Sequence, residues 1–357
     1  MGLPTPPAFR SPDTMVPQDW PRLAAFLRAQ GHALSAERPP RQFASGFGNL
    51  NYLIEMDGVD AVLRRPPLGP IPPGANDMRR EHRILSGLWQ AFPLAPRSLV
   101  FCDDEGVLGA PFFIMEFRPG IVIGGTVPGG IDRPEAVGTQ LGPMLMRVLA
   151  DLHAVDPAAV GLGEFGRPDG FLERQIAGWI ARAGIAWDGA PSPLAVELGD
   201  WLTRKRPRHS PAPTLLHNDF KLDNMVLDPA SLDPVAVLDW DLGTRGDPLV
   251  DLGVTLAYWV EAADPWAMHA IDQMPSAGHA FPSRRDAAEL YAGYSGRDLS
   301  DILYYRVFGQ FRIAVVFMQL NRRYREGGTD DPRFAEFGRI AEGLLEFGQE
   351  ITQGRAF

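Results

Sequence analysis

The pattern H-x-D-x-K-x-x-N, which ends at Asn224, constrains the fold of this chain more than any other feature. Two short apolar runs, residues 214–216 and 235–238, enclose it and have the length and composition of buried strands. Asp219 and Asn224 share one tight loop, and Asp239 directly follows the second run. If the two strands are neighbours, three oxygen-bearing side chains meet at one point. We therefore expect a strand–loop–strand unit that carries a functional site.

These side chains suit the chemistry of phosphoryl transfer. That reaction needs a carboxylate that orients and deprotonates the accepting hydroxyl, and oxygen ligands that hold Mg²⁺ on the phosphates. The spacing predicts that Asp219 is the base. Asn224 and Asp239 are the predicted metal ligands, and Asp241 is predicted as a second metal contact. A single aspartate here would also fit an ordinary polar turn, but the complete spaced set favours the functional interpretation.

Two further residues of this loop are candidates for the catalytic set. Lys221 is one of only two lysines in the chain and lies two residues after Asp219. A cation there could neutralise charge on the transferring group, although a surface lysine is the alternative. His217 is predicted to support the loop by hydrogen bonding rather than to act as a base.

The loop resembles the catalytic and metal-binding loops of the aminoglycoside phosphotransferase/choline kinase family, which is related to the protein kinases. Compared with the protein-kinase pattern, Asn218 replaces an arginine, and Trp240 and Asp241 replace Phe-Gly. The Asp-Trp-Asp form is typical of the small-molecule kinases in that family. The resemblance therefore implies ATP and Mg²⁺ as cofactors and a small-molecule hydroxyl acceptor.

The same resemblance assigns roles nearer the N-terminus. In kinases a strand lysine contacts the phosphates and pairs with a helix glutamate; here Arg64 takes the lysine position and Glu81 is its expected partner. The backbone of Glu116 and Phe117 would meet the adenine edge. A glycine-containing turn before a predicted hairpin could cover the phosphates, although such a turn is also common in plain hairpins. This candidate loop comprises Ser45, Gly46, Phe47, Gly48 and Asn49.

The order of predicted elements indicates an α+β, two-lobed, protein-kinase-like fold. Residues 1–40 are expected to form an extension with one short helix. Residues 41–118 read as a small antiparallel sheet with one helix, and residues 119–357 as a larger, mostly helical lobe. A nucleotide would lie in the cleft between the two lobes.

Several stretches are similar to one branch of the family, the phosphotransferase domains that occur beside or fused to acyl-CoA dehydrogenases. That similarity implies a hydroxyacyl acceptor, notably a 4-hydroxyacyl-CoA. Arg174 and Arg312 could bind an anionic acceptor or serve as structural arginines. The similar stretches are residues 62–67, 80–85, 160–168, 173–179 and 308–323.

Composition limits the other possibilities. The net charge of −10 over 357 residues disfavours a nucleic-acid partner or an anionic membrane surface. No apolar run reaches the roughly 18 residues of a membrane span, and no secretory signal is visible. The single cysteine, Cys102, favours a reducing, cytoplasmic compartment. The alternative functions are an aminoglycoside- or choline-type kinase and a degenerate nucleotide-binding protein. The sequence does not decide between a monomer and a homodimer, or between ATP and GTP.

Overall fold

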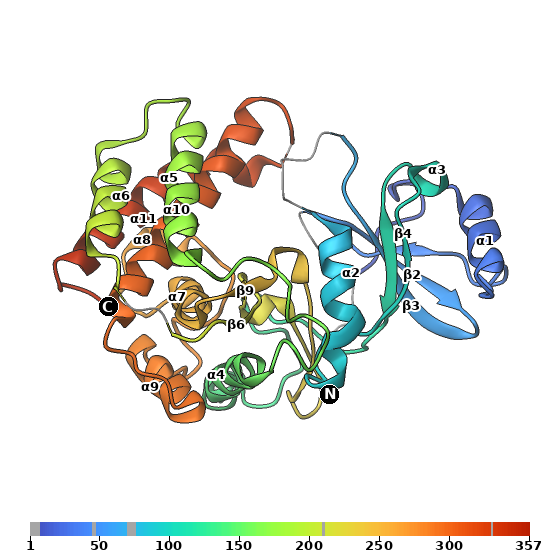
Figure 1. Ribbon diagram of the computed structural model, residues 1–357, viewed down its shortest axis with the longest axis horizontal. Helices are drawn as coiled ribbons and strands as arrows, with labels where there is room; N and C mark the ends of the chain where they lie inside the picture. The colour runs from blue at the N-terminus through green and yellow to red at the C-terminus, as the bar shows by residue number, and fades with distance from the viewer. Residues whose placement is uncertain (1–7, 45–47, 70–75, 209–210, 330) are drawn as a thin grey trace.

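The computed structural model describes residues 8–44, 48–69, 76–208, 211–329 and 331–357. Its N-terminal part is an antiparallel sheet with the strand order β1-β2-β3-β5-β4 (Figure 1). The central hairpin turns at Asp57 and Gly58, which both have positive φ and so match the twist of the strands. The strands are β1 (Arg41–Gln42), β2 (Leu50–Met56), β3 (Val59–Arg65), β4 (Ser98–Cys102) and β5 (Phe112–Glu116).

Both faces of this sheet are covered, because successive side chains of a strand point to opposite sides. On β3, Val62 belongs to the core shared with α2 (Met78–Gly87), whereas Leu63 belongs to a separate core under α1 (Trp20–Ala29). The Asp77 side chain caps α2 by accepting a hydrogen bond from the backbone N–H of Arg80. Figure 1 shows α2 between the sheet and the rest of the molecule.

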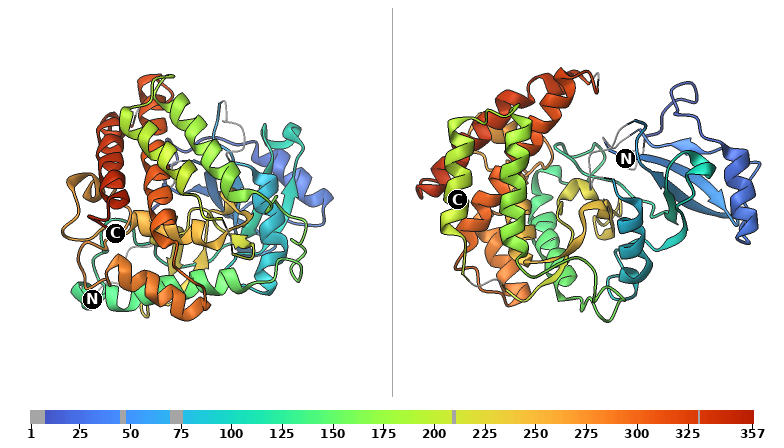
Figure 2. Two further views of the ribbon diagram at one scale, coloured as in Figure 1. Left: turned by 60° about the vertical axis from the view of Figure 1, so that its left-hand side comes forward. Right: turned by 45° about the horizontal axis from the view of Figure 1, so that its top comes forward.

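The C-terminal part is mainly helical. Its helices surround a middle segment of short strands, coloured yellow in Figures 1 and 2, which lies between the helices and α2. The helices are α4 (Gly138–Ala154), α5 (Phe171–Ala186), α6 (Pro193–Lys205), α7 (Pro248–Tyr258), α8 (Trp266–His269), α9 (Arg284–Ser295), α10 (Ile302–Arg325) and α11 (Phe337–Thr352). A further short helix, α3 (Glu105–Leu108), lies beside the sheet.

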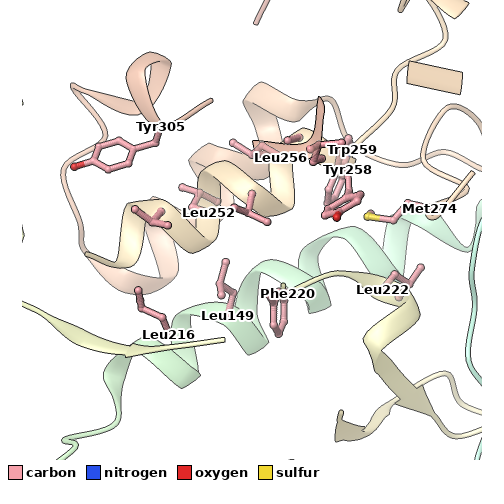
Figure 3. Packing of buried hydrophobic residues seen from close by; sticks show 14 of the residues in the cluster. Leu149, Leu216, Phe220, Leu222, Leu252, Leu256, Tyr258, Trp259, Met274 and Tyr305 are labelled. Carbon is pink, nitrogen blue, oxygen red and sulfur yellow. The ribbon is translucent and has the colours of Figure 1, made fainter. Parts of the chain in front are cut away.

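The middle segment contains two antiparallel strand pairs. β6 (Thr214–Leu216) pairs with β9 (Thr244–Gly246), and β7 (Met225–Leu227) pairs with β8 (Pro234–Val237). The side chains of Phe220 and Leu222, in the loop after β6, are completely buried. Figure 3 shows them in the same core as Leu149 of α4 and Leu252 of α7. This burial anchors the polar residues of the loop to the helical core.

Helices α7 and α10 cross at a pair of glycines. Every residue of α7 is buried. A Cβ atom on Gly309 would lie 2.2 Å from the backbone oxygen of Gly253, and one on Gly253 would lie 2.2 Å from the backbone oxygen of Tyr305. Glycine is therefore required at both positions for this close approach.

The structure confirms the predicted α+β order of a small antiparallel sheet followed by a mainly helical part. Helix α4 begins at Gly138, after a 3₁₀ turn at 134–136, and α7 ends at Tyr258. Among the described residues, no helix is both long and apolar enough to cross a lipid bilayer.

Candidate active site

The buried ion pair between Arg64 and Glu81 connects the sheet to α2. Arg64 Nε lies 2.7 Å from Glu81 Oε2. The other carboxylate oxygen, Glu81 Oε1, accepts a hydrogen bond from the backbone N–H of Trp240 at 3.2 Å. Because Trp240 follows β8, Glu81 fixes β3, α2 and the predicted metal loop to one another.

Arg64 also reaches the predicted metal ligand Asp239. Its Nη2 pairs with Asp239 Oδ1, and its Nη1 donates to Asn51 Oδ1 on β2 at 3.3 Å. Burial alone would lower the pKa of Arg64, but the carboxylates of Glu81 and Asp239 outweigh it and raise that pKa. The pair with Asp239 was not among the contacts predicted from the sequence.

Asp219 and Asn224 contact each other directly, as their shared loop predicts. Asn224 Nδ2 donates to the backbone oxygen of Asp219 at 2.8 Å and to Asp219 Oδ2 at 3.1 Å. This leaves the side-chain oxygen of Asn224 as an acceptor. The short 3₁₀ turn Leu222–Asn224 and the burial of Leu222 hold the side chain in this position.

Lys221 lies beside the candidate base. Its Nζ is 3.1 Å from Asp219 Oδ2 and 3.7 Å from Asp223 Oδ1, and it stands 4.7 Å from the ring centroid of Tyr258. Burial would raise the pKa of Asp219, but Lys221 and Arg312 outweigh it and lower that pKa. Asp219 is therefore a carboxylate at neutral pH.

His217 uses both ring nitrogens to hold the loop. Its Nε2 lies 2.8 Å from the backbone oxygen of Leu238, and its Nδ1 lies 3.2 Å from the backbone N–H of Asp219. A neutral ring that donates at Nε2 and accepts at Nδ1 satisfies both contacts. This geometry fits the predicted supporting role of His217.

Asp251 braces the loop from α7. Its Oδ2 accepts from the backbone N–H of His217 at 2.7 Å, and its Oδ1 accepts from that of Asn218 at 2.6 Å. Behind it, His153 Nε2 lies 3.2 Å from Asp251 Oδ2, and His153 Nδ1 lies 2.7 Å from the hydroxyl of Tyr291. This buried chain connects α4, α7 and α9 to the loop.

Two arginines considered for acceptor binding bind main-chain carbonyls instead. Arg312 Nη2 donates to the backbone oxygen of Asn218, and its guanidinium stands 5.0 Å from the ring centroid of Trp179. Arg174 donates to the backbone oxygens of Asp169 and Arg167. Both arginines therefore fit the structural alternative.

Two nearby acidic side chains have raised pKa values. Burial raises the pKa of Asp241 to about 8, and the Asp239 carboxylate adds to the shift. Burial likewise raises the pKa of Asp223 to about 6, with contributions from Asp219 and Asp239.

Closely spaced carboxylates favour a divalent cation, so the donor set fits Mg²⁺. Within the described ranges, however, no three His, Cys, Asp or Glu side chains form a metal-binding group. The amide oxygen of Asn224 and the oxygens of a nucleotide would have to complete the coordination.

The predicted nucleotide contacts are described only in part. Ser45, Gly46 and Phe47 lie outside the described residues. Asn49 Oδ1 accepts from Asn76 Nδ2 at 2.9 Å. Glu116 pairs with Arg118 at 2.8 Å through its side chain, and Phe117 packs beside Phe43 at a centroid distance of 6.3 Å. Gly48 also lies within the described part of this segment.

Sequence reasoning missed three contributors to the site. Asp223 lies inside the recognised pattern, so its position between Lys221 and Asn224 was an available signal. Asn51 and His153 lie in distant segments, and only the tertiary fold brings them to the site.

The structure is similar to solved phosphotransferases. A Ralstonia eutropha protein provisionally assigned as an aminoglycoside phosphotransferase matches with a TM-score of 0.76 and 28% identity, covering 95% of this chain and 99% of the other. A thermostable mutant of the aminoglycoside phosphotransferase APH(4)-Ia, solved with AMP-PNP and hygromycin B, matches with a TM-score of 0.54 and 17% identity, covering 91% and 98%.

Curated sequences give a second comparison. Acyl-CoA dehydrogenase family member 10 of Mus musculus is 30% identical over 321 residues, which is 88% of this chain and 29% of that protein. The chain spans less than half of the length of the acyl-CoA dehydrogenase relatives that it matches.

The fold is the kinase-like fold of solved phosphotransferases. The model of the phosphotransferase enzyme family matches residues 40–289, and this chain belongs to that family. The resemblance stated from the sequence is thereby confirmed, including the link to the acyl-CoA dehydrogenase relatives.

Proposed function

We propose that this protein transfers the γ-phosphoryl group of ATP to a hydroxyl of a small molecule with the help of Mg²⁺. The observation that carries this proposal is the Lys221–Asp219–Asn224 cluster, in which a partly exposed, ionised carboxylate lies 3.1 Å from a lysine and 3.1 Å from the asparagine amide. A base, a cation and an amide oxygen within one loop are what phosphoryl transfer requires.

Asp219 would orient the acceptor hydroxyl and take its proton as the new O–P bond forms and the bond to ADP breaks. Lys221 would neutralise charge on the transferring group. His217 and Asp251 would keep the loop backbone in place during the step. Positioning and charge stabilisation would then supply most of the catalysis, without a covalent intermediate on the protein.

Asn224 and Asp239 would hold Mg²⁺, with Asp241 as a second contact. Bound Mg²⁺ supplies charge neutralisation on the phosphates. Arg64, braced by Glu81, would bind the phosphates, and the segment at Gly48 and Asn49 would cover them. The backbone at Glu116 and Phe117 would contact the adenine edge.

A hydroxyacyl-CoA is the proposed acceptor. The similarity to acyl-CoA dehydrogenase family members supports this choice. The electrostatics next to Asp219 support it as well, because Lys221 and Arg312 are the main charges that lower the pKa of Asp219, and both would repel a cation. The similarity to a protein assigned as an aminoglycoside phosphotransferase favours the second candidate, a kinase for aminoglycosides or choline-like amino alcohols.

Release of ADP tests both candidates. The purified chain is incubated with Mg²⁺–ATP and, in turn, hydroxyacyl-CoAs, amino alcohols and aminoglycosides. We expect release that depends on the acceptor and is highest with a hydroxyacyl-CoA. Asp219→Asn should reduce this rate by about 10²–10⁴-fold while ATP still binds. If no acceptor stimulates ADP release although nucleotide binds, the degenerate nucleotide-binding alternative holds and the enzyme proposal fails.

A further inference from the structure

All three guanidinium nitrogens of Arg64 are engaged, each by a different segment. Nε pairs with Glu81 of α2, Nη1 donates to Asn51 of β2, and Nη2 pairs with Asp239 after β8. The Arg64 and Glu81 side chains are only 8% and 1% exposed, whereas that of Asp239 is 39% exposed. Arg64, the residue expected to bind phosphate, is thus already paired with Asp239, a residue expected to bind the metal.

This arrangement depends on the shape of arginine. A guanidinium presents its donors in a rigid planar fork and can bind carboxylates on two sides at once, whereas a lysine offers a single nitrogen. Arg64 and Asn51 are directly opposite each other in the β2–β3 register, which fixes one side of the fork. Glu81 fixes a second side.

The backbone on both sides of Asp239 is also fixed. The N–H of Leu238 donates to the backbone oxygen of Asn224 at 2.8 Å, and the N–H of Trp240 donates to Glu81 at 3.2 Å. With this backbone held, a rotation of the Asp239 side chain is sufficient to take the carboxylate away from Arg64.

We propose that Arg64 couples the binding of nucleotide to the binding of the divalent cation. Without nucleotide, Arg64 holds the Asp239 carboxylate and weakens its interaction with the cation. Phosphate oxygens compete for the Nη2 side of the guanidinium and release Asp239 toward the cation. This inference rests on the proposed function, because it assumes that Asp239 and Arg64 face the same metal–nucleotide complex.

The coupling must be reciprocal. If nucleotide increases the affinity for the cation by some factor, the cation increases the affinity for nucleotide by the same factor. In the described part of the chain no three acidic, His or Cys side chains are grouped for a metal, so the site proposed here has few charged donors of its own while Arg64 holds Asp239. The free protein should therefore bind the cation weakly.

Binding of Mn²⁺, followed by its electron paramagnetic resonance signal, tests the proposal without any turnover. The purified chain is titrated with Mn²⁺ in the presence and absence of ADP, and ADP affinity is measured by calorimetry with and without Mg²⁺. We expect the protein–ADP complex to bind Mn²⁺ at least about tenfold more tightly than the free protein, within the usual range of coupling between sites. Mn²⁺ held by ADP alone is subtracted from a protein-free titration.

Arg64→Lys should reduce this ratio by about threefold or more, because the free protein gains affinity for Mn²⁺ when Asp239 is released from the guanidinium, while the direct contribution of the ADP oxygens stays the same. Arg65→Lys is the matched control. Arg65 is its buried neighbour on β3 and donates to Gln18 and to the backbone oxygens of Leu108 and Pro66. The Arg65 variant should keep the ratio of the unaltered protein.

The possible outcomes separate the two proposals. Equal Mn²⁺ affinity with and without ADP, or an unchanged ratio in Arg64→Lys, overturns the coupling while the proposed function stands. A lack of ADP binding under all conditions overturns both. If Arg64→Lys does not fold, Asp239→Asn decides, because it should remove the gain in Mn²⁺ affinity that ADP causes, and a retained gain overturns the inference.

Discussion

The carboxylate of Asp251 on α7 lies 2.6 Å from the backbone nitrogen of Asn218, next to the candidate base. Its second oxygen binds the neighbouring amide of His217, and the Asp251 side chain is completely buried. Since α7 is buried along its whole length, the loop takes its position from the centre of the helical core. Substitutions that alter the packing of α7 are therefore expected to move the loop that carries the candidate base.

The Asp251→Asn variant tests this brace. An asparagine offers one acceptor oxygen and sets its NH₂ group against the other backbone amide, so a buried amide loses its partner. We expect the free energy of unfolding to fall by about 2–4 kcal/mol, measured by urea unfolding. Asp151→Asn, on the exposed side of α4, is the control and should stay within about 0.5 kcal/mol. Equal stability of the two variants would contradict the brace.

The buried His153 predicts a loss of stability in acid. Burial lowers the pKa of His153, so the unfolded chain binds a proton near pH 6.5 that the folded chain does not. Protons at His153 then favour unfolding below about pH 6.5, whereas the raised pKa values of Asp241 and Asp223 act in the opposite direction, because the folded chain binds those protons more tightly. His153→Gln should reduce the slope of unfolding free energy against pH between about 7.5 and 5.5. His82, whose pKa is also lowered by burial, and the two aspartates keep their contributions in this variant; an unchanged slope would exclude His153 as a source of the pH dependence.

Removal of Lys221 should change the pH dependence of turnover. Among the groups that lower the pKa of Asp219, Lys221 is the largest. In Lys221→Met the pKa of Asp219 should rise, so the carboxylate forms only at higher pH and the acid limb of kcat/KM should move upward. We also expect kcat to fall by about 10²-fold because charge neutralisation is lost. The measurement is ADP release at several pH values.

The matched control for this experiment is the other lysine of the chain. Lys205 lies on the exposed end of α6, so Lys205→Met should leave both kcat and the pH profile unchanged. An acid limb that stays in place in the Lys221 variant would mean that Lys221 does not control the ionisation of the base.

The glycine pair at the crossing of α7 and α10 gives a prediction about packing. Gly309→Ala places a methyl group against the backbone of Gly253 and should destabilise the fold by about 1–3 kcal/mol. Gly293→Ala, in α9, meets nothing within 4 Å and should stabilise the fold by about 0.5–1 kcal/mol. Thermal unfolding of both variants checks the prediction, and a stable Gly309 variant would show that the helices can move apart at little cost.

The sequence predicted the main elements because their signals are local. The Asp57–Gly58 turn of the central hairpin and the Asp77 cap of α2 are local signals of this kind. The strand β9 was missed, because three residues ending in Gly246 carry no periodic pattern. Its pairing with β6 is a tertiary contact, and such contacts override weak local preference.

In the candidate site, too, the local contacts could be predicted from the sequence and the long-range contacts could not. Asp219 and Asn224 could be placed together because they are only five positions apart in the sequence. The pair between Arg64 and Asp239 spans 175 residues and depends on how three segments converge around one guanidinium. The sequence pattern places Arg64 where kinases have a lysine that binds phosphate. That comparison does not indicate the additional pair between Arg64 and the metal loop.

The backbone of Asp239 limits which residues the chain can accept at this position. Its φ of 69° lies in the left-handed region, which glycine, asparagine and aspartate adopt more readily than other residues and where branched or bulky residues are strained. Of these three, only aspartate brings a negative charge. The backbone conformation and the need for a negative charge each limit the residue types that fit at position 239. Asparagine is the replacement that removes the charge and keeps the backbone conformation.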